Sequence, residues 1–242
     1  LIPALPPRPF RRRGRSCPGP ITAGREPDVT DLSHIRLTGR PLIISDVDDV
    51  ILEFIEPYQR FLNARGLKFL PRSFRLTGNV VRVTDDTPVT EEDVKQSLHD
   101  FFEEQHVWQR PFDHVLTALP QLAETADIVF LTAMPPKFTA ARRLHLDALG
   151  LHFPLVAVET AKGPIASMIR DRHTAPVVFV DDMAHNLASV AEHLPDCLLL
   201  SLAPPSQVHA MAPKPPETAR IVRDWAEATP IIHTHFATTL GA

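Results

Sequence analysis

Five short apolar runs constrain the fold of this chain of 242 residues most strongly. Each run is rich in Val, Ile or Leu and lacks the alternation of apolar and polar residues that is typical of a half-exposed strand. Such runs indicate strands that are covered on both faces, as in a parallel sheet between two layers of helices. The runs are residues 41–45, 127–132, 154–159, 176–181 and 197–202.

Stretches with helical spacing separate these runs. Pro111 suits the first turn of one of them, and Gly150 suits the C-terminal end of the next. The alternation of strand and helix predicts an α/β fold with a doubly wound, Rossmann-like parallel sheet. We expect its core to comprise residues 39–52 and 110–205. The helical stretches are residues 111–126, 138–150, 162–172 and 184–194.

The first two runs are separated by a segment far longer than one crossover needs. Apolar residues recur in it at helical spacing, and Thr90 and Asp93 resemble a capping box that starts a second helix. We therefore predict that residues 53–109 form a small, mainly helical cap over the strand ends. The sequence leaves open the alternative that these helices extend the main core.

The two ends of the chain carry many of its 25 prolines. We expect residues 1–38, rich in Pro and Arg, to be a disordered leader, because proline at this density blocks helix formation. A targeting peptide is the alternative. Residues 206–242 are expected to be a tail with a short helix over 215–228, in which Ile221 and Trp225 face inward.

Composition excludes several classes of protein. The net charge of −4 provides no global basic field for nucleic acid, and no apolar run approaches the roughly 18 residues of a membrane span. The two cysteines, Cys17 and Cys197, lack the spacing of a zinc site and are too few for a disulfide framework. We therefore expect a cytoplasmic protein. The sequence leaves its oligomeric state open.

Polar side chains stand where the predicted strands end. Because the carboxyl ends of parallel strands meet at one edge of a sheet, these side chains are expected to lie together. Carboxylates this close repel one another and raise one another's pKa, so a bound cation is the simplest means of keeping them ionised. The residues are Asp46, Asp48, Thr132, Lys162, Asp181 and Asp182.

In order and type, these segments resemble the four motifs of the haloacid dehalogenase superfamily of phosphohydrolases. The first motif is "LIISDVDDV", an apolar strand followed by Asp-x-Asp-x-Val, and the second is "IVFLT", which ends in Thr132. The third is Lys162 at a helix start, and the fourth is "VVFVDD". The resemblance covers about residues 40–205 and places the predicted cap between the first and second motifs.

The resemblance implies a role for each residue. Asp46 would attack phosphorus, and Asp48 would protonate the leaving group and later deprotonate water. Thr132, Ala133 and Lys162 would contact the phosphoryl group. Mg2+ would be held by the carboxylates of Asp46 and Asp181 and by the backbone carbonyl of Asp48, since it prefers oxygen ligands. Asp182 would bind it through water or orient Lys162.

Two further side-chain assignments concern the surroundings of these motifs. Asn186 either supports the loop that carries the metal ligands or caps the following helix. Met134, Lys137 and Phe138, which follow the second motif, are expected to line the entrance to the site.

The leading interpretation is a Mg2+-dependent phosphatase that acts on a small phosphorylated metabolite. Asp48 favours phosphate over carbon–halogen substrates, because a halide leaves without a proton. The sequence leaves open a phosphomutase and a non-catalytic binding or regulatory protein with the same fold. A response-regulator receiver is less consistent with the order of the motifs, because in a receiver the acidic pair comes early in the chain, whereas here it comes last.

Overall fold

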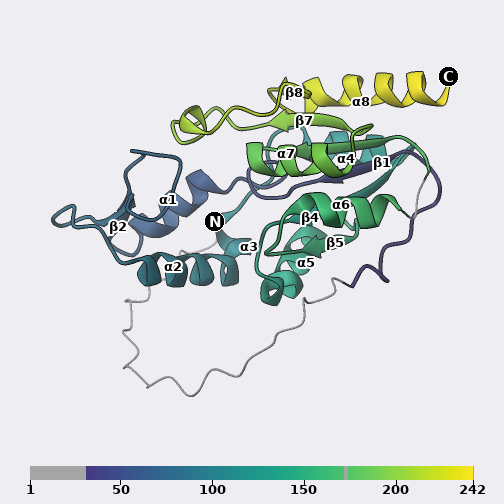
Figure 1. The fold of residues 1–242 in the computed structure, drawn as a ribbon. Helices are drawn as coiled ribbons and strands as arrows, with labels where there is room; N and C mark the ends of the chain where they lie inside the picture. Colours follow the sequence, from purple (N-terminus) through teal and green to yellow (C-terminus); the bar gives the residue numbers. More distant parts are fainter. Residues whose placement is uncertain (1–30, 172–173, 242) are drawn as a thin grey trace, which may run out of the picture.

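The computed structural model describes residues 31–171 and 174–241. At its centre lies a six-stranded sheet with the order β5-β4-β1-β6-β7-β8, in which every paired strand is parallel (Figure 1). The five predicted strands and the doubly wound α/β fold are confirmed, and a sixth strand extends one edge. The strands are β1 (Leu42–Ser45), β4 (Asp127–Thr132), β5 (Leu155–Ala157), β6 (Val177–Asp181), β7 (Leu198–Leu202) and β8 (Ala219–Val222).

Successive residues of β1 supply two apolar layers, one on each face of the sheet. Leu42 and Ile44 pack in the layer beneath α6 and α7, whereas Ile43 packs in the layer beneath α4, α5 and α8. All three side chains are fully buried, as expected for a central strand covered on both faces. The helices are α4 (Val115–Ala123), α5 (Thr139–Ala148), α6 (Lys162–Arg170), α7 (Ala184–His193) and α8 (Trp225–Leu240).

The close approach of α6 to α7 requires a glycine. A Cβ atom at Gly163 would collide with the backbone carbonyl of Ser189 in α7. Gly163 is the second residue of α6, so this contact fixes the start of the helix, where Lys162 lies.

Strand β1 is the point at which the winding of the sheet reverses. From β1 the chain goes to β4 and β5 on one side, and then crosses to β6, β7 and β8 on the other. Ser45 pairs with both Phe130 of β4 and Val180 of β6, so the three strands end at nearly the same level. Ligands of open α/β sheets bind beyond the carboxyl ends of strands at such a reversal.

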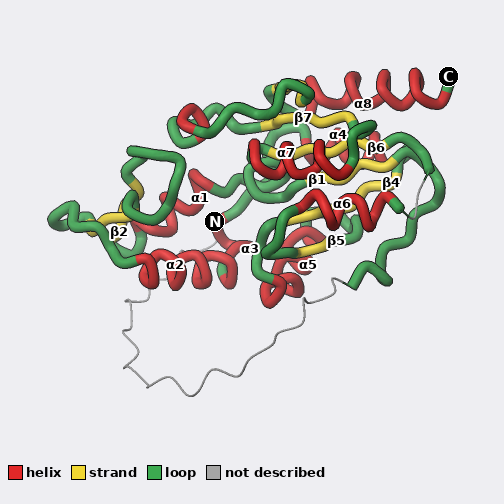
Figure 2. Tube along the Cα trace, in the orientation of Figure 1, coloured by secondary structure: helices red, strands yellow, loops and turns green. Residues whose placement is uncertain are grey.

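An insertion between β1 and β4 stands to one side of the sheet (Figure 2). Its apolar side chains form a cluster distinct from the two layers on the sheet, built around Tyr58, Phe61 and Phe101. Thr90 and Asp93 form the predicted capping box. The insertion comprises α1 (Ile55–Asn63), the antiparallel pair β2 (Leu67–Phe69) and β3 (Val80–Arg82), α2 (Glu91–Glu103) and α3 (Gln105–Trp108). The domain boundaries themselves stay a prediction.

The two connections that join the insertion to the sheet run side by side. The backbone N–H of Glu53 donates to the carbonyl of Arg110 at 2.9 Å, and that of Phe112 donates to Ile51 at 3.0 Å. The insertion therefore enters and leaves the core through one hydrogen-bonded pair of segments.

The structure corrects the expectations for both ends. Residues 1–30 of the predicted leader lie outside the described residues, but Leu32 and Ile35 are buried against the layer that includes α6. This segment has too few apolar residues to show a periodic pattern in the sequence. Residues 31–38 therefore adjoin the α/β core, whereas they were expected to belong to a disordered leader.

The expectation of a short helix over 215–228 is wrong: strand β8 lies within that range, and helix α8 begins only at Trp225 and has 16 residues. Ile221 is 69% exposed, so the expectation that it faces inward is wrong. It lies on the outer side of an edge strand, where alternation turns its neighbour Val222 inward instead. Trp225 is buried as expected, and its indole donates to the carbonyl of Val50 at 3.0 Å.

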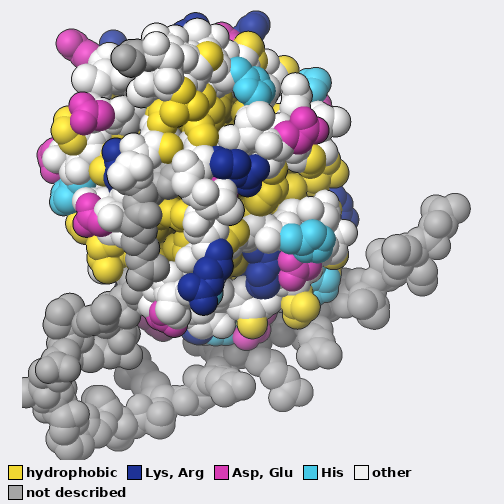
Figure 3. All heavy atoms as spheres, turned by 90° about the vertical axis from the view of Figure 1, so that its right-hand side faces the viewer, with side chains coloured by type: hydrophobic (Ala, Val, Ile, Leu, Met, Phe, Trp, Pro, Cys, Tyr) yellow, Lys and Arg dark blue, Asp and Glu magenta, His cyan; other side chains and the backbone are white. Residues whose placement is uncertain are grey.

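Figure 3 views the end of the molecule remote from the insertion. Lys and Arg side chains stand there in separate small groups, with acidic and apolar side chains between them. Among the described residues, none of the helices combines the length and the apolar character needed to cross a membrane.

Candidate functional site

A fully buried lysine joins the ends of two strands at the carboxyl edge of the sheet. The Nζ atom of Lys162 lies 2.7 Å from Oδ1 of Asp46, after β1, and 2.7 Å from Oδ2 of Asp181, at the end of β6. Burial alone would lower the pKa of Lys162, but the carboxylates of Asp181 and Asp46 raise it, so the ammonium stays charged. The structure thus brings together the first, third and fourth predicted motifs.

Three carboxylates converge beside this lysine. Asp46, Asp181 and Asp182 each offer one oxygen atom, and these atoms all lie within 4.8 Å of one another. Burial, with repulsion from Asp181, raises the pKa of Asp182 well above its ordinary value. Burial also raises the pKa of Asp46, against the opposing effect of Lys162.

A cation suits this donor set. Oδ1 of Asp182 is buried and has no hydrogen-bond partner among the described residues. Lys162 supplies one positive charge beside these three carboxylates, so the cluster carries an excess of negative charge. Hard divalent cations prefer such oxygen ligands, and one bound here would supply the charge.

The orientation of Asp181 is fixed by its own loop. Its Oδ1 accepts hydrogen bonds from the backbone N–H of Met183 at 2.8 Å and from the side-chain amide of Asn186 at 3.1 Å. Of the two alternatives for Asn186, the structure therefore shows support of the acidic loop; α7 has no side-chain cap.

Asp48 is held by a buried polar network. Its carboxylate accepts hydrogen bonds from Arg142 of α5 at 2.9 Å, from Gln109 at 2.8 Å and from the hydroxyl of Thr132 at 3.4 Å. Arg142 also donates to Gln105 of α3. The side chains of Arg142, Gln105 and Gln109 are fully buried, so the insertion and the core share this network.

Sequence reasoning missed Arg142, Gln105 and Gln109. All three are polar residues inside or beside amphipathic helices, where a solvent-facing position is the ordinary expectation. In the pattern of α5, however, Arg142 occurs one helical turn before the buried Leu146. That placement on the apolar face is a signal for a buried charge, which needs a partner.

Asp49 closes the loop after β1. Its φ of 58° lies in the left-handed region, which Asp tolerates better than most residues. Its carboxylate accepts hydrogen bonds from the backbone N–H of Phe54 at 2.8 Å and of Ile55 at 3.2 Å, at the start of α1. Burial and repulsion from Asp182 raise the pKa of Asp49 to about 7.

His209 reaches the site from the loop after β7. Its Nε2 lies 3.1 Å from Oδ2 of Asp182, and its Nδ1 lies 2.7 Å from the hydroxyl of Ser206. Val208 beside it is buried in the apolar cluster of the insertion. From the sequence, this proline-rich segment was expected to be a loop of the tail, and His209 was not assigned to the site.

A cavity of about 310 Å³ opens above these groups. Five of the predicted site residues line it, while Lys162 and Asp181 lie buried beneath. Met134 and Phe138 do not line it as expected, because they pack in the apolar cluster of the insertion. The five residues are Asp46, Asp48, Thr132, Ala133 and Asp182.

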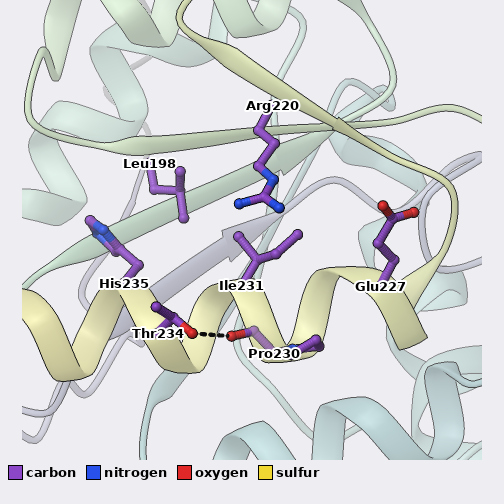
Figure 4. Close-up of a pocket in the computed structure, with 7 residues that line it drawn as sticks. All are labelled: Leu198, Arg220, Glu227, Pro230, Ile231, Thr234 and His235. Carbon is purple, nitrogen blue, oxygen red and sulfur yellow. Dashed lines mark hydrogen bonds between the residues drawn. The ribbon is translucent and has the colours of Figure 1, made fainter.

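A larger hollow, of about 500 Å³, lies between α8 and the strands β7 and β8 (Figure 4). Thr234 donates there to the carbonyl of Pro230 at 2.8 Å, and Glu227 accepts from Arg223 at 2.9 Å. Glu227 is the one carboxylate among the described residues that line this hollow, whereas several carboxylates converge at the smaller cavity, where we place the chemistry.

No family model matches the sequence, and no curated protein matches it. Solved structures do match the fold. A haloacid dehalogenase-like family hydrolase from Streptococcus pneumoniae superposes with a TM-score of 0.53 at 10% identity, covering 81% of this chain and 99% of that one. The L-2-haloacid dehalogenase of Xanthobacter autotrophicus gives 0.53 at 10% identity, covering 79% and 98%. A predicted phosphoglycolate phosphatase from Haemophilus somnus gives 0.52 at 16%, covering 80% and 98%.

We predict that Arg142→Met destabilises the protein strongly. The substitution removes the cationic partner of Asp48 and a hydrogen-bond donor to Gln105, and breaking such a buried pair costs about 3 kcal/mol of unfolding free energy. Arg223→Met is the matched control, since Arg223 pairs with Glu227 at the same 2.9 Å but is 85% exposed. Urea denaturation should show no measurable change for the control. Equal effects of the two substitutions would contradict the structural role of the Arg142 network.

We predict that the metal-free protein loses stability as the pH rises from about 4 to about 7. Asp49 binds its proton up to about pH 7 in the folded chain, whereas an unfolded Asp releases it near pH 4, so proton release disfavours the folded state. Mg2+ at about 100 times its dissociation constant should add about 2.7 kcal/mol at pH 8 and much less at pH 5, where protons compete.

Thermal unfolding with and without Mg2+ at both pH values measures this effect. Asp182→Asn should remove most of it, while Asp85→Asn, an exposed acid of the insertion, should retain it. An equal stabilisation at pH 5 and pH 8 would contradict a carboxylate metal site.

Proposed function

Because the chain has the fold of the haloacid dehalogenase superfamily, we propose that it is a Mg2+-dependent phosphohydrolase that acts on small phosphorylated molecules. The single observation that carries the proposal is the pairing of one buried lysine with the acids that follow β1 and β6. A phosphoryl group needs a nucleophile, positive charge and hydrogen-bond donors around its oxygens, and this edge of the sheet offers all three.

Asp46 is the proposed nucleophile. An oxygen of its carboxylate attacks phosphorus, the bond from phosphorus to the leaving oxygen breaks, and an aspartyl-phosphate forms. Lys162, 2.7 Å from Asp46, balances the negative charge that builds up around it. Thr132, whose hydroxyl is at the end of β4, donates to a phosphoryl oxygen.

Asp48 is the proposed general acid and base. It gives a proton to the leaving alkoxide and then takes one from the water that hydrolyses the aspartyl-phosphate, so its own proton is restored at the end of the cycle. Its side chain is 19% exposed and lines the cavity, which leaves it accessible to substrate. Arg142 and Gln109 hold it in place from the opposite side.

Mg2+ would be held by the carboxylates of Asp46 and Asp181 and by the backbone carbonyl of Asp48, with Asp182 beside it. When bound, it supplies positive charge that offsets the acids and stabilises the phosphoryl oxygens. The crowding of these buried carboxylates supports this assignment.

The direct test measures phosphate release from p-nitrophenyl phosphate with Mg2+ and with a chelator. We predict turnover that depends on Mg2+ and is abolished by Asp46→Asn, because an amide is not a nucleophile toward phosphorus. Asp113→Asn, an exposed acid outside the site, is the control and should retain turnover. No Mg2+-dependent release from this ester or from a broad panel of phosphoesters would support a non-catalytic binding protein instead.

We predict that Asp48→Asn discriminates between leaving groups. An alkyl phosphate needs a proton for its basic alkoxide, so its hydrolysis should slow by roughly 10²–10⁴. The first step with p-nitrophenyl phosphate needs no such proton, so burst release of p-nitrophenol should persist. Equal loss of the burst and of alkyl ester hydrolysis would contradict the assignment of Asp48 as the acid.

A further inference from the structure

The wall of the cavity on the insertion side is mainly apolar, whereas its floor is polar and acidic. The floor carries the acids and Thr132, whereas the wall contributed by the insertion is apolar apart from Arg75. Val208, from the loop after β7, adds to the same wall. The apolar residues of the insertion that line the cavity are Phe54, Ile55, Phe74, Leu76 and Phe102.

Three of the polar side chains that line the cavity already contact other side chains of the protein. Asn186 donates to Asp181, His209 contacts Asp182, and Thr132 faces Asp48 and the expected phosphate position. Arg75 and His185 are exposed and stand at the rim. A substrate body above the phosphate would therefore meet carbon on the insertion side and would find few free donors or acceptors there.

This lining discriminates between classes of phosphoester. An apolar ring gains from contact with the Phe and Leu side chains, whereas each hydroxyl of a sugar would lose its hydration without a compensating hydrogen bond. Even one unpaired hydroxyl corresponds to about a tenfold loss in affinity, and a sugar carries several.

We propose that the substrate is a phosphate monoester of an alcohol with an apolar or aromatic body, not a sugar phosphate. The inference rests on the proposed phosphohydrolase activity and adds to it the class of leaving group. The insertion is thereby the element that selects the substrate, since it supplies five of the apolar side chains that face the substrate body.

The test compares cyclohexylmethyl phosphate with glucose 6-phosphate. Both are primary alkyl phosphates with a six-membered ring, so they differ chiefly in the hydroxyls of the ring. We expect kcat/KM to favour the cyclohexyl ester by about 100-fold or more. A ratio within about threefold, or a preference for the sugar, would overturn the proposal.

A substitution in the apolar wall tests whether this wall causes the preference for the cyclohexyl ester. Leu76→Ser should reduce it about tenfold, mainly through a higher KM for the cyclohexyl ester, because it adds a polar group to the half-buried wall. Leu116→Ser is the control, an exposed leucine of α4 that should leave the ratio unchanged. A Leu76→Ser ratio equal to that of the unmodified protein would place the selectivity elsewhere and overturn the role of this wall.

Two further measurements separate failure of the inference from failure of the proposed function. Hydrolysis of cyclohexylmethyl phosphate and glucose 6-phosphate at equal kcat/KM would leave the activity standing and remove the substrate class. If no ester turns over, calorimetry with the non-hydrolysable phosphonate analogues of the two ring esters, in the presence of Mg2+, still decides. Tighter binding of the cyclohexyl phosphonate supports the apolar class, and equal or absent binding overturns it.

Discussion

The site depends on the balance of charge around one buried ammonium. Lys162 is excluded from water and lies between Asp46 and Asp181, each at 2.7 Å. Neither acid could be buried there without it, because an isolated buried carboxylate is far too costly. The geometry in turn requires α6 to begin beside α7, which the absence of a side chain at Gly163 permits. A single glycine therefore helps to place the ammonium around which the acidic edge of the sheet is organised.

Much of this arrangement could be predicted from the sequence, because strand ends in a parallel sheet meet at one edge. The apolar runs located five of the six strands, and the polar residues that follow them mark the same edge. The edge strand β8 escaped prediction, since it is four residues long and only Val222 is buried. The burial of Leu32 and Ile35 was not predicted either, because two apolar residues near a proline-rich segment form no periodic hydrophobic pattern.

The residues that surround the acids were less predictable. Arg142, Gln109 and His209 come from a helix, a connection and a loop, and their contacts depend on tertiary packing that no local pattern encodes. Two of the residues expected at the entrance to the site failed for the same reason: Met134 and Phe138 pack in the apolar cluster of the insertion instead of facing the cavity. Similarity to solved structures at 10–16% identity supports the fold, while the proposed chemistry rests on the side chains at the sheet edge.

The paired connections at Glu53 and Arg110 have a consequence for how such a protein diversifies. Since the chain leaves and rejoins the sheet at adjacent points, the intervening residues can drift in sequence without disturbing strand order or the motifs. The polar network through Gln105 and Gln109, together with the packing of Met134, Phe138 and Val208 in the apolar cluster of the insertion, ties the two parts energetically. Under the proposed function, evolution could thus exchange the wall that would contact the leaving group while keeping the acids of the sheet edge, provided that these contacts are preserved.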